Sequence, residues 1–154
     1  MFLGTFEARS KDTTEIQGSM ATISSRYLGQ LRTEQTHLAS GSTFKTDAPT
    51  DNHGKGELFS PTDTVCAALS ACMITLMGIA ANTHKIEITG LQAEVTKIMA
   101  SDPRRIAEIV VRFYDFPVKL SEKEQSILER AARTCPVALS LHSELVQTIS
   151  FEWP

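Results

Sequence analysis

The amino-acid sequence predicts an α+β fold with antiparallel strand pairing. Residues 60–82 are apolar on every side, as expected of a helix that is enclosed by other elements. Segments before and after this helix alternate apolar and polar residues with the period of half-buried strands. A later segment, residues 121–135, carries the apolar stripe of an amphipathic helix. The expected order is therefore strands, buried helix, hairpin, amphipathic helix and final strand.

The composition is that of a globular chain with one domain. Of 154 residues, 42% are hydrophobic and 21% are charged, which excludes disorder, collagen and coiled coil. The formal net charge is −3 and the only local basic cluster is Arg104 with Arg105, so nucleic acid is not an expected partner. The three cysteines have no CxxC spacing, which predicts no structural metal site and a reducing, cytoplasmic location.

Residues 1–19 predict a polar N-terminal extension or an expression tag. They are unpatterned and lack the apolar run of a secretory signal. Met20 follows Gly18 and Ser19 and is a candidate for the natural start, so the domain is expected to span residues 20–154.

The first strands are expected within residues 23–46. Thr, Tyr, Ile and Phe favour short strands there, and Gly29 and Gly41 favour tight turns between them, which predicts an antiparallel meander. Residues 47–59 are rich in Pro, Gly, Asp and Asn and predict a loop that leads into the central helix.

The central helix has a well-marked start. Ser60 is the expected N-cap, Pro61 fits the first turn, and Asp63 lies near the positive end of the helix dipole. Residues 65–81 carry no charge, a length at the lower limit for a membrane span. The Ala-rich composition and the lack of flanking basic clusters favour a core helix instead, so no membrane partner is predicted.

The second half of the chain predicts a long hairpin, a helix and a strand. Residues 84–89 alternate as a strand, Gly90 marks a bulge, and the alternation resumes before a return strand over residues 105–113. Ser121 and Glu124 form a capping box at the start of the amphipathic helix. Residues 144–153 alternate again and predict the final strand.

The cysteines are the main candidates for chemistry. Cys66 and Cys72 lie roughly 240° apart around the central helix, so they cannot pair with each other within it. Cys135 continues the inward stripe of the later helix, where Pro136 disturbs the backbone. If Cys72 and Cys135 meet in the core, one thiolate can attack a peroxide and the other can resolve the sulfenic acid to a disulfide. On spacing alone, simple packing of buried thiols remains the alternative.

Two motifs resemble the OsmC/Ohr family, named for osmotically inducible protein C and organic hydroperoxide resistance protein. They are DAPTDNHGKGELFSPTDTVCAALSACMITLMGI at residues 47–79 and ARTCPV at residues 132–137. The order of the expected elements agrees with that family over roughly residues 27–154. The resemblance implies curved antiparallel sheets wrapped around a buried central helix in an intertwined homodimer, with thiol sites near the subunit interface.

Carried over to this sequence, the resemblance makes Cys72 the peroxidatic cysteine and Cys135 the resolving cysteine. In peroxidase members, an Arg from the early strands favours the thiolate form of the first cysteine. Arg32 is the candidate for this cation, and Arg26 is second.

The family's Glu that orients this Arg falls on Thr62, which carries no charge. Asp63 or Glu57 is therefore the candidate to hold the Arg, although simpler roles, a helix-start acid for Asp63 and a solvated loop charge for Glu57, explain them adequately and are favoured. This departure makes the chain more similar to the OsmC-like branches than to strict organic hydroperoxide reductases.

The leading functional hypothesis is a thiol-dependent peroxidase for small organic hydroperoxides in oxidative stress defence. Its electrons would come from an external dithiol reductant, and the resemblance implies no hydride cofactor and no haem. The second hypothesis is a non-catalytic dimer that binds a small apolar ligand and whose thiols are structural. Cys66 is expected to be structural and His53 to be a solvated loop residue.

Overall fold

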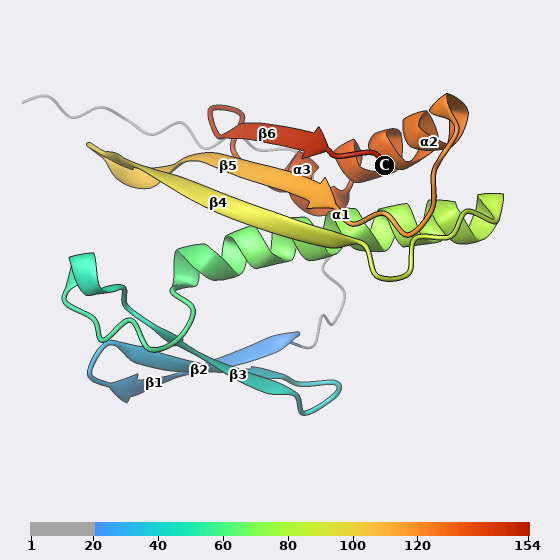
Figure 1. Cartoon of the computed structure of the whole chain (residues 1–154). Helices are drawn as coiled ribbons and strands as arrows, with labels where there is room; N and C mark the ends of the chain where they lie inside the picture. Colours follow the sequence, from blue (N-terminus) through green and yellow to red (C-terminus); the bar gives the residue numbers. More distant parts are fainter. Residues whose placement is uncertain (1–20) are drawn as a thin grey trace, which may run out of the picture.

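A computed structural model describes residues 21–154, which form two sheets, one long helix and two shorter helices (Figure 1). The first sheet has three antiparallel strands in the order β1, β2, β3, with bounds Ile23–Gly29, Arg32–His37 and Thr43–Asp47. A short 3₁₀ turn, η1 (Thr50–Asn52), leads to helix α1 (Pro61–His84). The second sheet contains β4, β5 and β6, with bounds Gln92–Ser101, Arg104–Tyr114 and Val146–Phe151. Helices α2 (Glu122–Arg133) and α3 (Pro136–Ser140) connect β5 to β6.

The α+β class, the two sheets and the central helix agree with the sequence prediction, but one strand pairs in the other direction. Strand β6 runs parallel to β5, with Val111 opposite Ile149, whereas antiparallel pairing was expected. The reason is the connection: α2 and α3 carry the chain back along the sheet, as a crossover between parallel strands requires.

The prediction of a strand at residues 84–89 is wrong. Helix α1 continues to His84, and Lys85 follows in the left-handed conformation with φ 58°. Both Lys85 N–H and Ile86 N–H donate to the carbonyl of Ala81, and the buried Ile86 side chain anchors this helix end. The apolar and polar residues alternate over too few positions to form a strand here, because the long helix α1 extends into the segment.

Helices α1 and α2 pack on one face of the second sheet. The shared core contains side chains with no exposed surface from α1, from alternate positions of β5 and from α2: Leu69, Met73, Met77, Ile109, Val111, Phe113 and Leu128. Each large side chain buried in this way stabilises the fold by roughly 1.5–3 kcal/mol. Helix α1 also meets the length and hydropathy criteria for a membrane span, but core helices meet them as well.

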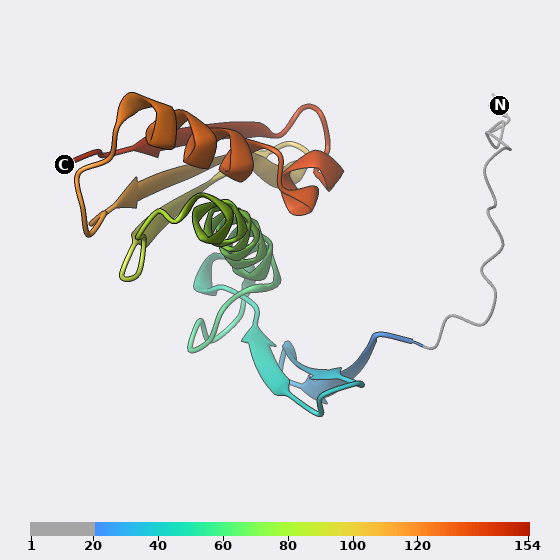
Figure 2. The ribbon, with the colours of Figure 1, turned by 90° about the vertical axis from the view of Figure 1, so that its right-hand side faces the viewer.

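The opposite face of α1 is uncovered in the single chain. Ala68, Ala71, Thr75 and Ile79 lie on it, and Ile79 is 56% exposed. The first sheet lies to one side of the second (Figure 2) and exposes Tyr27 by 64%. The enclosure expected for an all-apolar helix is therefore incomplete within one chain.

Candidate functional site

The two cysteines expected to form a redox pair are neighbours in the folded chain. Cys72 lies in the middle of α1 and is partly exposed, whereas Cys135 is fully buried between α2 and α3. Both are reduced. Pro136 cannot extend α2 and instead occupies the first turn of α3. Cys135 is consequently the N-cap of α3, and its Sγ accepts a hydrogen bond of 3.3 Å from the Ala138 N–H.

Burial raises the pKa of the Cys135 thiol. The hydrogen bond from Ala138 acts in the opposite direction, while a hydrogen bond and charge interaction with Cys72 raise the pKa of Cys135 further. This mutual influence requires the two thiols to be close in space, although they are far apart in sequence. Cys135 is thus held as a protonated thiol beside Cys72.

Arg32 is fixed by carboxylates. Its Nε and Nη2 donate to Asp47 Oδ1 and Oδ2 at 2.6 and 2.7 Å, and Nη2 also donates to Glu57 Oε2 at 2.7 Å. The bond from Arg32 is the main reason that the pKa of Asp47 lies below its usual value, and the two carboxylates raise the pKa of Arg32. Within residues 21–154, the hydrogen bonds of Arg32 lead to these two carboxylates and none leads to a thiol.

The sequence analysis named Glu57, beside Asp63, as a candidate partner of Arg32 but missed Asp47. Arg32 and Asp47 are opposite each other in the β2–β3 pairing. Asp47 lies one residue beyond the strand region expected from the sequence, so the prediction did not place it opposite Arg32. Arg26, the second candidate cation, is exposed on β1 opposite Glu34, and within residues 21–154 no hydrogen bond joins it to a cysteine.

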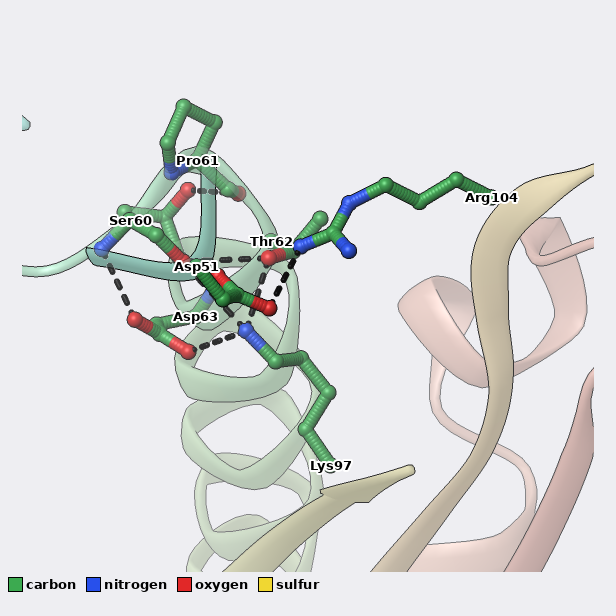
Figure 3. A network of polar contacts seen from close by, with 8 residues as sticks. Asp51, Ser60, Pro61, Thr62, Asp63, Lys97 and Arg104 are labelled. Carbon is green, nitrogen blue, oxygen red and sulfur yellow. Dashed lines mark hydrogen bonds and ion pairs between the residues drawn. The ribbon is translucent and has the colours of Figure 1, made fainter. Parts of the chain in front are cut away.

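Asp63 does not contact Arg32 and instead belongs to a second network at the start of α1 (Figure 3). Its Oδ2 accepts from the Ser60 N–H at 2.8 Å in a capping box, and its Oδ1 accepts from Lys97 Nζ at 2.6 Å. Lys97 also donates to Thr62 Oγ1 at 2.7 Å. Burial raises the pKa of Asp63, but the bonds from Lys97 and Ser60 outweigh it, so the pKa is lowered.

Lys97 is therefore the cation that contacts Thr62 and Asp63 at the start of α1, and the sequence analysis did not identify it. It comes from β4, far from Thr62 in sequence, so only the packing of β4 beside α1 brings the two together. Beside this network, Arg104 Nη2 donates to Asp51 Oδ2 at 2.9 Å (Figure 3).

Cys66 lies in different surroundings from the thiol pair. It lines a pocket of about 900 Å³ together with Asp63 and Lys97. Burial raises the pKa of the Cys66 thiol, although Lys97 acts in the opposite direction. The part of the chain that the structure describes contains no cluster of three His, Cys, Asp or Glu side chains able to hold a metal ion.

The fold and these contacts define a two-sheet α+β protein whose long apolar helix presents one thiol to a second, buried thiol. The family model of OsmC-like protein matches residues 54–150, and the chain belongs to this family. No functionally curated protein matches the sequence.

Solved structures of related proteins agree with the family. A protein from Psychrobacter arcticus, named for osmotic stress induction and detoxification response, is 46% identical with a TM-score of 0.84, and the match covers 87% of this chain and 97% of that chain. Two others share the fold at low identity. The organic hydroperoxide resistance protein OsmC of Legionella pneumophila is 14% identical with a TM-score of 0.66 and coverages of 87% and 98%. The OsmC-like protein of Mycoplasma pneumoniae is 17% identical with a TM-score of 0.70 and coverages of 88% and 97%.

Proposed function

We propose that this protein is a cytoplasmic thiol-dependent peroxidase that reduces small organic hydroperoxides in oxidative stress defence. The observation that carries the proposal is the interaction of the Cys72 and Cys135 thiols inside one chain. Membership of the OsmC-like family supports it, as do the names of the Legionella and Psychrobacter proteins.

In the proposed cycle, the Cys72 thiolate attacks one oxygen of the O–O bond. That bond breaks, the alcohol leaves with a proton, and Cys72 becomes a sulfenic acid. The Cys135 sulfur then attacks the Cys72 sulfur, an S–S bond forms and water leaves. An external dithiol donates two electrons and two protons to regenerate both thiols.

We further propose that the active form is a homodimer. Cys72 borders the uncovered face of α1, on which Ala68, Ala71 and Ile79 lie. A second copy on this face would shield the thiol pair from bulk water and bury apolar surface. Light scattering tests this: a mass of twice 16.9 kDa is expected, and a monomer at working concentration would contradict it.

The peroxidase proposal is tested by mixing the reduced protein with cumene hydroperoxide and counting the free thiols that remain. We expect rapid loss of two thiols per chain in the wild type and in the Cys66→Ser control. In the Cys72→Ser variant, the remaining Cys135 thiol should not be lost. A known thiol peroxidase serves as the positive control. If its thiols are oxidised under the same conditions while Cys72 and Cys135 stay reduced, the proposal fails.

One observation favours the alternative of a non-catalytic ligand-binding dimer. The cation expected to activate Cys72 is instead engaged by Asp47 and Glu57. If the protein is of this kind, the Cys72→Ser variant should bind a small apolar ligand as tightly as the wild type does. A catalyst would lose turnover in the same variant.

A further inference from the structure

A pocket lies between the first sheet and the start of α1. Its volume is about 400 Å³, within the range of small-molecule sites, and its walls come from the first sheet, the loop before α1 and the end of the β4–β5 hairpin. The apolar part of the wall includes Leu31, Ala48, Pro61 and Met99. We call this cavity the sheet–helix pocket. Neither thiol of the redox pair lines it, so its role is independent of the proposed peroxidase function.

Thr62 brings to this pocket a hydroxyl proton that has no acceptor in the chain. Ser60 Oγ accepts from the Asp63 N–H at 3.1 Å and from Lys97 Nζ at 3.3 Å, which uses both of its lone pairs. In the 3.0 Å hydrogen bond between the two hydroxyls, Ser60 is therefore the donor and Thr62 the acceptor (Figure 3). Thr62 Oγ1 also accepts from Lys97 Nζ at 2.7 Å, and within residues 21–154 no hydrogen bond uses its own proton.

The sheet side of the pocket carries a second pair of hydroxyls. Thr33 and Thr46 are opposite each other in the β2–β3 pairing, and their Oγ1 atoms are 2.6 Å apart, so one of their two protons lies between the oxygens. Thr33 Oγ1 also accepts from Gln35 Nε2 at 3.0 Å. The second proton of the pair has no acceptor among the described residues, although Thr46 is only 4% exposed. A buried donor without an acceptor is costly, and a ligand oxygen would remove this cost.

The charged groups beside the pocket are already balanced. Arg104 lines the pocket and donates to Asp51 at 2.9 Å. Lys97, which donates to Thr62, is paired with Asp63 at 2.6 Å. An anionic ligand would compete with these two carboxylates for cations that are paired, and it would be repelled by both. An uncharged acceptor takes the free hydroxyl protons without this cost.

We infer that the sheet–helix pocket binds a small uncharged molecule with an apolar body and a carbonyl oxygen, and that this oxygen accepts the hydroxyl proton of Thr62. The Thr33–Thr46 pair is a second donor in the same pocket. An alcohol fits less well, because its own proton would need an acceptor and the lone pairs of Ser60 and Thr62 are in use. The apolar body would pack against Leu31 and Met99.

The test compares acetophenone with α-methylstyrene, which has the same shape but a methylene group in place of the carbonyl oxygen. Binding to the whole chain is followed through the backbone amide signals of Leu31, Ala48 and Asn52 in ¹H–¹⁵N NMR spectra. We expect saturable shifts at these amides and an affinity for acetophenone that is about fivefold higher, the gain typical of one hydrogen bond. Benzoate, which has the same ring and a negative charge, should bind more weakly than acetophenone.

Two variants assign the donors. Thr62→Val removes the hydroxyl and keeps the side-chain shape, so it should weaken acetophenone binding by about fivefold and leave α-methylstyrene binding unchanged, whereas Thr62→Ser should bind both probes as the wild type does. Thr64→Val is the matched control, since Thr64 lies on the same turn of α1, donates to the Pro61 carbonyl at 2.6 Å and does not line the pocket. The double variant Thr33→Val/Thr46→Val keeps a cross-strand pair that suits a sheet, and it should also weaken acetophenone binding.

The inference is overturned if the wild type binds acetophenone and α-methylstyrene equally, or if benzoate binds more tightly than acetophenone. It is also overturned if Thr64→Val weakens acetophenone binding as much as Thr62→Val. The comparison of the three probes uses the wild type alone, so it does not depend on whether a variant folds. None of these results bears on the turnover of cumene hydroperoxide, which tests the proposed function separately.

Discussion

The thiol pair and the ion pairs of Arg32 and Lys97 are positioned by different forces. Cys72 and Cys135 are brought together by apolar packing of α1 against α2, and by a proline that ends α2 beside Cys135. Arg32 and Lys97 are positioned by carboxylates, Asp47 and Asp63, which also neutralise them. The two thiols thus meet within one chain, whereas Arg32 and Lys97 are committed to structural ion pairs.

The largest expected effect concerns the first thiol. Cys72→Ser should reduce peroxidase turnover by at least about a thousandfold, because it removes the nucleophile. Cys135→Ser should keep a first turnover and then stop at the sulfenic acid, which a dimedone adduct detected by mass spectrometry would report. Equal multiple-turnover rates for the wild type and Cys135→Ser would show that the pair does not act as a unit.

A second expectation concerns the packing that joins the thiols. Leu128 is fully buried on α2 against α1, and Leu128→Ala should destabilise the protein by about 2–5 kcal/mol. Urea unfolding measures this change. The exposed Leu139, with 73% of its surface accessible, is the matched control, and Leu139→Ala should change stability by less than about 0.5 kcal/mol. Similar losses for both variants would contradict the packing described for α2.

The raised pKa of Cys135 predicts a pH dependence of the second chemical step. The thiolate is the attacking form, and burial raises the pKa of Cys135 above the usual range of a thiol, so disulfide formation should accelerate with pH by about tenfold per unit between pH 6 and 8. Stopped-flow decay of the Cys72 sulfenic acid measures this rate. A rate independent of pH over that range would mean that Cys135 is not held as a protonated thiol.

The smallest effect is expected in the ion-pair region at low pH. In the folded protein, the pKa of Asp47 is lowered from its usual value of 3.8. The Asp47 carboxylate therefore stabilises the fold above pH 3.8, and this stabilisation is lost as the pH falls through the pKa of the folded state. Asp47→Asn should therefore lower the melting temperature at pH 7 by several degrees. In this variant the melting temperature should also decrease less between pH 7 and acid pH than it does in the wild type. Glu57→Gln, which changes the more exposed partner of Arg32, should have a smaller effect at both pH values.

Much of the fold follows from local signals in the sequence. The Ser60 N-cap, the Ser121 capping box, and the hairpin of β4 and β5 agree with the pattern of the chain. The direction of β6 does not follow from local signals, because the helical crossover determines it.

The ion pairs were harder to predict because they depend on register and tertiary packing. Asp47 pairs with Arg32 only once β2 and β3 are aligned, and Lys97 contacts Thr62 only once β4 packs beside α1. Neither residue carries a motif of its own. Asp63 was correctly identified as a helix-start acid, but its basic partner was not.

Peptide mapping after oxidation tests most directly whether two sulfurs far apart in the chain act on each other. One equivalent of organic hydroperoxide is added to the reduced protein, which is then digested without reductant and analysed by mass spectrometry. We predict one dominant crosslink, between the peptides that contain Cys72 and Cys135, within a single chain. A disulfide that involves Cys66, or Cys72 oxidised to the sulfinic acid with Cys135 still reduced, would contradict the account.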